Sequence, residues 1–200
     1  MGSASARDLP MAVVKVGGSL TAQPHTFDRV CDAVSDASRL HRLVVVPGGG
    51  PFADAVREFQ RNLGLSDEAA HWMAILAMDQ YAHVLAERIR GAVILEEPGM
   101  VLSTVAPGRP AVLAPSRWMR SADVLPHTWE VTSDSIAAFI AGALDASQLI
   151  LIKPKEDPST LDPCFMLSLP AGLPYQILGW ERVSRLTKLL TEQNAAGGPG

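Results

Sequence analysis

The chain alternates between short runs of apolar residues, many of them β-branched, and longer segments in which apolar residues recur at helical spacing. The short runs predict buried strands, because a strand of a parallel sheet is covered on both faces and needs no polar positions. They occupy residues 11–16, 43–46, 92–95, 111–114, 149–152 and 175–178. The longer segments predict helices that each bury one face. They occupy residues 27–40, 51–63, 68–90, 133–144 and 180–190.

Start and stop signals support these boundaries. Pro51 suits the first turn of its helix, since the backbone N–H that proline lacks has no partner there, and Gly64 suits the position just past the end. Ser66 is expected to cap the long helix that follows, and Gly91 to stop it. The alternation of strands and helices predicts a mostly parallel sheet with helices on both faces.

Composition and charge narrow the class of protein. The 200 residues are enough for one domain, and a content of 48% hydrophobic and 19% charged residues excludes disorder as the main state. No apolar run reaches the roughly 18–20 residues that a membrane span needs. The net charge is −4 and no basic stripe stands out, so we expect neither nucleic acid nor membrane as a partner.

The cysteines and the chain ends give three further expectations. Cys31 and Cys164 lie outside any CxxC or Cys/His cluster, which favours two reduced thiols in a cytoplasmic protein. The N-terminus carries no apolar segment of the kind found in signal peptides. We expect a single domain over residues 11–193, with flexible ends at 1–10 and 194–200.

Two of the predicted strands end in glycine-rich loops. One loop is KVGGS, residues 15–19, and the other is VVVPGGGP, residues 44–51. Ligands of parallel α/β sheets bind at the carboxyl ends of strands, and glycines there let backbone N–H groups approach an anion. Gly48, Gly49 and Gly50 run directly into a helix N-terminus, so they are candidates for a phosphate cradle. The alternative is a pair of glycine turns without a ligand.

Two charged residues lie in apolar surroundings. Lys15 is inside an otherwise apolar strand, where an unpaired ammonium group is costly. It therefore either points to a polar site at the strand end or pairs with a buried carboxylate. Asp134 opens a helix of small and apolar residues, either as an ordinary first-turn acid or as a group that holds cations in position. The signatures GxxxxGK[ST] and GxGxxG are absent from the sequence, which excludes the Walker and Rossmann interpretations.

Three segments together resemble one family. KVGGSL at 15–20, VPGGGPFADAVR at 46–57 and TSDSIAA at 132–138 resemble the motifs of the amino acid kinase superfamily, in the same order. That superfamily includes acetylglutamate, carbamate, uridylate and isopentenyl phosphate kinases. The segment HWMAILAMDQYAHVLAERI at 71–89 is similar to the branch that phosphorylates aminomethylfuran methyl phosphate to its diphosphate in methanofuran biosynthesis. Bacterial relatives of that branch serve the one-carbon carriers methylofuran and tetrahydromethanopterin.

The resemblance implies a fold and a reaction. The fold is an open three-layer αβα sandwich around a mostly parallel sheet, of the carbamate kinase type. The reaction is in-line transfer of the γ-phosphoryl group of ATP, with Mg²⁺, to a carboxylate or phosphate oxygen without a covalent enzyme intermediate. Residues 11–147 would bind the acceptor and residues 148–193 the nucleotide. The protein would be a homodimer or a larger homo-oligomer.

The resemblance also assigns roles to the two loops and their charged neighbours. Lys15 would neutralise the transferring phosphoryl group, and Asp134 would orient Lys15. No residue is assigned as a metal ligand. The loops would hold phosphates through their backbone and hydroxyl groups. Gly17, Gly18 and Ser19 would hold those of the nucleotide, and Gly48, Gly49 and Gly50 would hold that of the acceptor.

Further polar and aromatic positions are assigned to the acceptor. Thr132 and Ser133 would touch the substrate, and Asp79 would bind the ammonium group of an aminomethylfuran. Trp129 would stack on the furan ring, with plain packing as the alternative. Arg57 lies two turns into the helix after the glycines, where it forms either a helix-surface salt bridge or a substrate contact.

One segment departs from the family pattern. Members usually carry a TDVDG-like segment after the strand that corresponds to 149–152, and this chain has IKPKEDPSTLDP at 152–163 instead. We expect Lys153 to bind a phosphate of ATP as a second cation, although Lys153 and Lys155 would equally suit a solvated loop. The nucleotide-binding portion is expected to be shortened, which leaves two other functions open. One is a non-catalytic binding or assembly subunit, and the other is a kinase for uridylate, isopentenyl phosphate or carbamate.

Overall fold

A computed structural model of the chain describes residues 9–196. Within that range one sheet of six strands crosses the molecule, and all neighbouring strands are parallel in the order β3-β4-β2-β1-β5-β6. The strands are β1 (Met11–Val16), β2 (Arg42–Pro47), β3 (Val93–Leu95), β4 (Ala111–Leu113), β5 (Gln148–Lys153) and β6 (Tyr175–Gly179). Each strand lies where an apolar run predicts one. β1, β2, β4 and β5 are buried along their whole length, which explains why their sequences lack polar alternation.

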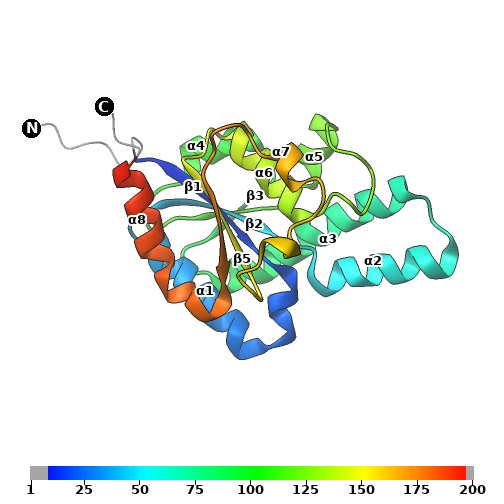
Figure 1. The fold of residues 1–200 in the computed structure, drawn as a ribbon, viewed down its shortest axis with the longest axis horizontal. Coiled ribbons are helices and arrows are strands. Elements are labelled where there is room, and N and C mark those ends of the chain that lie inside the picture. Colours follow the sequence, from blue (N-terminus) through cyan, green and yellow to red (C-terminus); the bar gives the residue numbers. More distant parts are fainter. Residues whose placement is uncertain (1–8, 197–200) are drawn as a thin grey trace, which may run out of the picture.

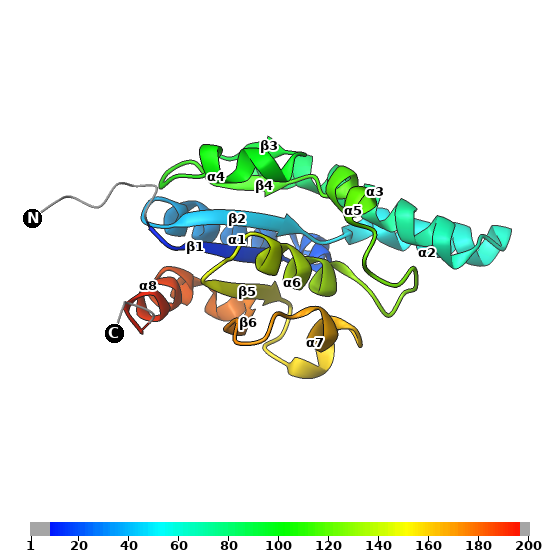
Figure 2. The same ribbon diagram turned by 90° about the horizontal axis from the view of Figure 1, so that it is seen from above.

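Helices cover both faces of this sheet (Figures 1 and 2). The α-helices are α1 (Pro24–Ser38), α2 (Gly50–Leu63), α3 (Asp67–Arg88), α4 (Val101–Thr104), α5 (Ser116–Ala122), α6 (Ser133–Ala143), α7 (Phe165–Ser168) and α8 (Leu186–Ala196). Short 3-10 helices are η1 (Gly18–Ala22), η2 (Pro98–Met100), η3 (Pro158–Thr160) and η4 (Trp180–Arg185). One apolar core joins α1, α8 and the end of α3 to one face of the sheet, and a second core joins α6 and α7 to the other. The expected three-layer αβα sandwich is confirmed.

The boundaries of the long helices follow their sequence signals. The Ser66 side chain accepts a hydrogen bond from the Ala69 backbone N–H at 3.2 Å, and Gly64 ends α2 in the left-handed conformation with φ of 65°. The last predicted helix is divided, because η4 precedes α8 and α8 runs on to Ala196. The turns α4, α5 and α7 are too short for a periodic pattern to mark, so the sequence did not indicate them.

α2 and the first half of α3 form a helical pair that projects beyond the carboxyl ends of the strands (Figure 1). This position leaves part of the predicted apolar face of α2 uncovered within the described chain. Ala53 and Val56 are buried, whereas Phe59 and Leu63 are exposed. The helical periodicity was therefore predicted correctly, but it marks a face that the sheet does not bury.

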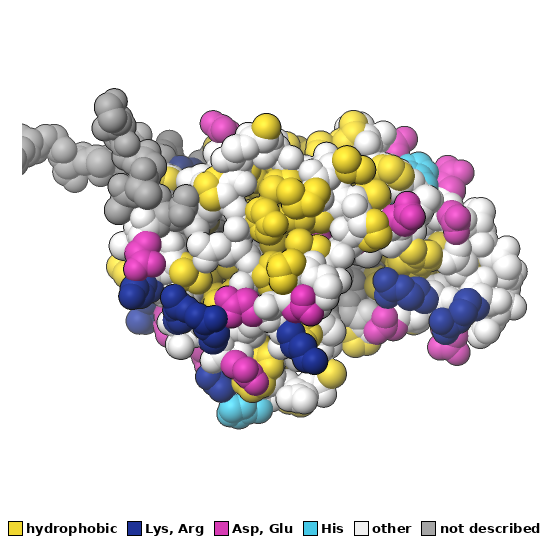
Figure 3. Space-filling view, viewed as in Figure 1, with side chains coloured by type: hydrophobic (Ala, Val, Ile, Leu, Met, Phe, Trp, Pro, Cys, Tyr) yellow, Lys and Arg dark blue, Asp and Glu magenta, His cyan; other side chains and the backbone are white. Residues whose placement is uncertain are grey.

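A second exposed apolar area lies over α7 and β6 (Figure 3). Met166 and Leu167 are largely exposed there, and β6 is an edge strand of the sheet. None of the helices within residues 9–196 is long and apolar enough to cross a membrane. The segments expected to be flexible, 1–10 and 194–200, lie mostly outside the described residues.

The two glycine loops after β1 and β2 pack directly against each other. A Cβ atom on Gly18 would lie 2.1 Å from the backbone nitrogen of Gly50, and one on Gly48 would lie 2.4 Å from the backbone nitrogen of Gly18. Gly50 itself has a φ of +55°, which an L-residue with a side chain rarely adopts. Gly18 and Gly48 are therefore required by the approach of one backbone to another, and Gly50 by its backbone conformation, with or without a ligand.

Replacing Gly18 by alanine is expected to lower the free energy of unfolding by about 2–3 kcal/mol, because the new methyl group would meet backbone that cannot rotate away. Gly99→Ala is the matched control, since a Cβ at Gly99 meets open space, and it should change the same quantity by less than about 0.5 kcal/mol. Urea unfolding of both variants measures the difference. Equal losses in the two variants would contradict the close approach of the loops.

Candidate active site

A buried cluster of two lysines and one aspartate lies where β1, β5 and α6 meet. Lys15 comes from β1, Lys153 is the last residue of β5, and Asp134 is in the first turn of α6. Lys15 Nζ is 2.9 Å from Asp134 Oδ1, and Lys153 Nζ is 2.5 Å from Asp134 Oδ2. The three residues are only 5%, 6% and 2% exposed, respectively. β1 and β5 are parallel neighbours, so their carboxyl ends bring both lysines to the same edge of the sheet.

The charges of this cluster depend on one another. Burial alone would raise the pKa of the Asp134 carboxyl, but the ammonium groups of Lys15 and Lys153 outweigh that effect and hold the pKa below its usual range. Burial lowers the pKa of Lys153, and its contact with Asp134 offsets part of that change. Asp134 is therefore a carboxylate at neutral pH. The sequence left two interpretations of Lys15 open, a buried ion pair and a polar site at the strand end. The structure supports both, because the lysine is ion-paired with Asp134 and also lines a cavity.

A cavity of about 250 Å³ opens beside the cluster, between α6 and the projecting pair of helices. Its polar wall is formed by Lys15, Lys153, Ser133, Gly18, Gly49 and Gly50. Its apolar wall is formed by Ala74, Ile75, Met78, Val131 and Ile136. Such a space suits a small molecule with an anionic end and an apolar body.

A second cavity of about 290 Å³ lies between the η1 loop and the segment after β5, and both lysines line it as well. The residues common to both cavities are Lys15, Lys153, Gly18, Ser19 and Thr160. A third cavity, beside Trp180, shares Pro154 and Lys155 with the second. The two lysines thus line two adjoining cavities, and the third cavity adjoins the second one near the end of β6.

The expected phosphate-binding glycines divide into two groups. Gly48 is buried and its N–H donates to the carbonyl oxygen of Val16 at 2.9 Å, and the Gly17 N–H donates to that of Ile152 at 2.9 Å. These two N–H groups are used within the protein, which differs from the prediction that they donate to phosphates, although Gly17 does line the second cavity. Gly49 and Gly50 line the first cavity, and Gly18 and Ser19 line both.

The acceptor residues predicted around Asp134 are also divided. Ser133 lines the first cavity. Thr132 lines it too, but its hydroxyl donates to Asp162 Oδ2 at 2.7 Å and is therefore not free for a substrate. Asp162 also accepts hydrogen bonds from the backbone N–H groups of Thr132 and Ser135, at 2.9 and 3.0 Å. Sequence reasoning missed Asp162, although it lies in the segment 152–163 that departs from the family pattern.

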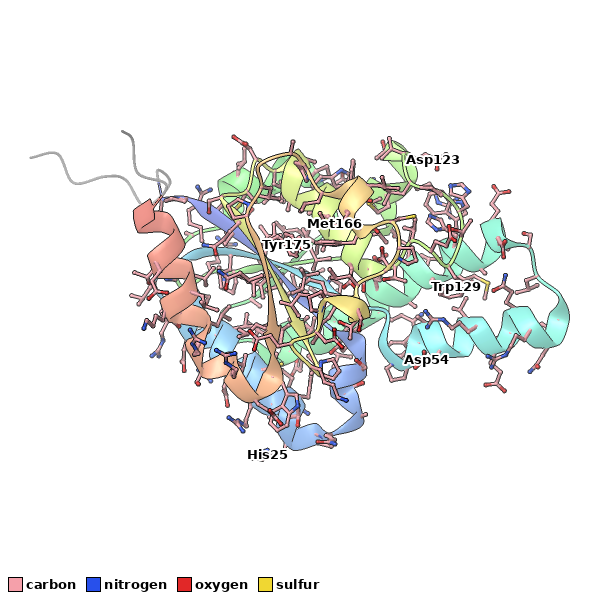
Figure 4. The ribbon with its side chains drawn as sticks, viewed as in Figure 1. His25, Asp54, Asp123, Trp129, Met166 and Tyr175 are labelled. Atoms are coloured by element: carbon pink, nitrogen blue, oxygen red, sulfur yellow. The ribbon has the colours of Figure 1, made fainter. Side chains whose placement is uncertain are left out.

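Trp129 reaches the first cavity from the loop that precedes α6, and it is held by α2. Its Nε1 donates to Gln60 Oε1 at 2.5 Å, and the Arg57 guanidinium carbon lies 4.1 Å from the ring centroid. Arg57 also forms the helix-surface salt bridge with Asp54 at 3.1 Å that sequence left as one alternative. Figure 4 shows Trp129 and Asp54 beside α2. One face of the indole ring is therefore covered by Arg57.

His71, a polar position on the apolar helix α3, forms another part of this wall. Its ring stacks on His127 with centroids 4.6 Å apart, and it is 7% exposed. Burial first, and then the neighbouring His127, lower the pKa of His71 to about 4. His127 in turn contacts Asp123 through Nε2 at 2.8 Å. The cavity wall therefore carries a neutral imidazole at neutral pH.

Asp79 lies elsewhere, in contrast to its expected role at the acceptor. It does not line the cavity, and its Oδ1 accepts a hydrogen bond from the Ser116 backbone N–H at 3.0 Å. That contact caps the first turn of α5, and burial raises the pKa of the carboxyl. Asp79 lies on the side of α3 that faces α5. The sequence pattern did not indicate this neighbour. Among residues 9–196 no group of three or more His, Cys, Asp or Glu side chains is arranged to hold a metal ion.

The chain matches known proteins in sequence. Residues 10–104 match the amino acid kinase family. The chain is 32% identical over 143 residues to a [5-(aminomethyl)furan-3-yl]methyl phosphate kinase of Methanocaldococcus jannaschii, which is 70% of this chain and 64% of the relative. It is 26% identical over 161 residues to a uridylate kinase of Methanococcoides burtonii, with 74% and 65% covered. The chain thus spans a little under two thirds of the length of these curated relatives.

Solved structures share the fold. A UMP kinase from Bacillus anthracis superposes with a TM-score of 0.67 at 10% identity, over 92% of this chain and 93% of that chain. A uridylate kinase from Archaeoglobus fulgidus gives 0.63 at 13% identity, over 90% and 96%. The chain is thus similar in sequence to the amino acid kinase family over residues 10–104, and its described residues share the fold of these two kinases.

Proposed function

We propose that this protein is an ATP-dependent phosphotransferase whose acceptor is itself a phosphate. The observation that carries the proposal is that Lys15 and Lys153, bridged by Asp134, line two adjoining cavities. Phosphoryl transfer needs a donor and an acceptor on opposite sides of one phosphorus atom, with cations beside the charge that spreads over its oxygens. The two adjoining cavities would take the two substrates, and the lysines supply the cations.

In this proposal the protein acts by positioning and by charge. An oxygen of the acceptor phosphate attacks the γ-phosphorus of ATP, a P–O–P bond forms, and ADP leaves with the β–γ bridging oxygen. A phosphate monoester is largely dianionic at pH 7, so its attacking oxygen needs no general base. Lys15 and Lys153 neutralise the transferring group, and Asp134 keeps both ammonium groups in place.

The second and third cavities are assigned to the nucleotide. Gly18 and Ser19 contribute a glycine loop to the phosphate end, and Lys155 and Trp180 line the continuation towards β6. Mg²⁺ would enter with the nucleotide, because this ion is commonly held by substrate phosphates and waters with few protein ligands. When bound, it neutralises phosphate charge together with the lysines.

The first cavity is assigned to an aminomethylfuran methyl phosphate, the substrate named for the Methanocaldococcus jannaschii relative. Gly49, Gly50 and the lysines would hold the phosphate end. The furan ring would lie on the apolar wall near Trp129, whose ring is already covered on one face. Asp54 lines the cavity and could pair with the ammonium group, a role that the position of Asp79 does not permit.

We also propose that the chain forms a homodimer or a larger homo-oligomer. The support is the apolar stripe on α2, where Phe52, Phe59 and Leu63 are exposed at 36%, 54% and 66%. Exposed apolar side chains that share one face of a helix are typical of a protein–protein contact.

Purified protein is expected to convert aminomethylfuran methyl phosphate into its diphosphate when supplied with Mg-ATP, with one ADP formed for each product molecule. Mass spectrometry detects the diphosphate and a coupled assay detects ADP. Uridylate, isopentenyl phosphate and carbamate serve as parallel acceptors, since uridylate kinases are also relatives. If no acceptor reacts and calorimetry shows no binding of a non-hydrolysable ATP analogue, the protein is a non-catalytic binding subunit.

Lys15→Met is expected to reduce kcat at least 100-fold, because it removes a cation from the transferring phosphoryl group while Asp134 keeps Lys153 as a partner. Lys188→Met is the control, since Lys188 is exposed on α8 and pairs with Glu192 at the surface. Circular dichroism verifies the folding of both variants. A folded Lys15→Met protein whose kcat is within threefold of the parent would disprove the assigned role.

A further inference from the structure

One carboxylate from the segment after β5 holds the beginning of α6. Asp162 Oδ2 accepts hydrogen bonds from Thr132 N, Thr132 Oγ1 and Ser135 N at 2.9, 2.7 and 3.0 Å, and Oδ1 accepts one from Ser135 Oγ. An ordinary helix cap is supplied by a residue adjacent to the helix. Here Asp162 is 27 to 30 residues away in sequence and receives four donors.

The same segment is held at a second point by Lys153. Lys153 Nζ donates to the carbonyl oxygen of Thr160 at 2.5 Å as well as to Asp134. The contacts therefore form a closed loop. Lys153 binds Asp134, Asp162 binds one residue on each side of Asp134 at the start of α6, and Lys153 also binds Thr160, two residues before Asp162. Asp134 lies between Thr132 and Ser135, the two residues that Asp162 binds.

We propose that Asp162 is a positioning residue for phosphoryl transfer, which fixes Asp134 and thereby sets the separation of the two lysine ammonium groups. The proposal rests on the proposed function in that it takes Lys15 and Lys153 as the cations of the transfer step. Thr132 Oγ1 lies 3.4 Å from the Asp134 N–H, too far for a firm cap of its own. The orientation of the first turn of α6 therefore depends on Asp162.

Asp162 also acts on Lys153 through its charge. The groups that face Lys153 are Asp134 from α6, Lys15 from β1 and Asp162 from the segment after β5. Burial lowers the pKa of Lys153, and Asp134 and Asp162 both act in the opposite direction. Removing the charge of Asp162 should therefore let Lys153 lose its proton at lower pH.

The test compares Asp162→Asn with Asp157→Asn. Asparagine keeps the shape of the side chain but replaces one accepting oxygen by an NH₂ group and removes the charge. Asp157 is the matched control, because it lies in the same segment and caps the exposed η3 by accepting from the Ser159 N–H at 2.9 Å. Three quantities are measured for each variant: kcat and KM for both substrates, the pH dependence of kcat, and the titration of Lys153 by NMR of ¹³Cε-labelled lysine.

Asp162→Asn should lower kcat about 10-fold or more with the KM of each substrate changed less than threefold, because misplaced cations affect the transition state more than binding. The decrease of kcat at high pH and the titration of Lys153 should both move to lower pH, because the Asp162 charge no longer raises the pKa of Lys153. Asp157→Asn should leave all three unchanged. Should Asp162→Asn fail to fold, Ser135→Ala removes one donor and should lower kcat three- to tenfold with KM unchanged.

A merely structural cap would give a different result. Asp162→Asn would then melt at lower temperature but keep its kcat at a temperature where it is folded, and the Lys153 titration would not move; that outcome overturns the proposal. The NMR titration needs no turnover. If the parent protein transfers phosphate to no acceptor, the proposed function fails on its own, and an unmoved Lys153 titration still separately rejects the action of Asp162.

Discussion

The Asp134 carboxylate stands between two buried ammonium groups, and much of this structure is arranged around that contact. Burying Lys15 and Lys153 without a partner would be costly, so Asp134 has to reach both. Asp162, from the segment after β5, adds a second negative charge near Lys153. The two lysines line two cavities at the carboxyl ends of the strands. In the proposed function, phosphate groups would bind the lysines there.

The backbone around the cluster is constrained just as tightly. The loops after β1 and β2 touch at Gly18 and Gly48, where a Cβ atom would clash with backbone, and Gly50 has a positive φ. The same contact places Gly18, Gly49 and Gly50 in the walls of the cavities. The glycines of these two loops therefore have two separate reasons, and packing between the loops accounts for Gly48 by itself.

Particular residues show what a pattern of amino acids can predict. The strands were identifiable because apolar β-branched runs must be buried on both faces of a parallel sheet. Lys15 was identifiable because an ammonium group in such a run requires a partner, and Asp134 because it begins a helix within the TSDSIAA segment. Asp79 was assigned to the acceptor and instead caps α5. The periodic pattern predicts that Asp79 lies on a helix, but it does not predict which element packs against that side of the helix. Phe59 and Leu63 have helical periodicity, but the projecting position of α2 leaves them exposed.

The sequence by itself determined the order of strands and helices, the αβα class and the residues that form the centre of the site. These follow from local periodicity and from the cost of burying a charge, which depend on a residue and its near neighbours in the chain. Only the tertiary structure decided which carboxylate Lys153 meets, that Asp162 holds the first turn of α6, and that two cavities adjoin at the lysines. Those contacts join residues that are far apart in sequence. The residues meet because of the order of the strands and the direction of the helices, and no local sequence pattern encodes either.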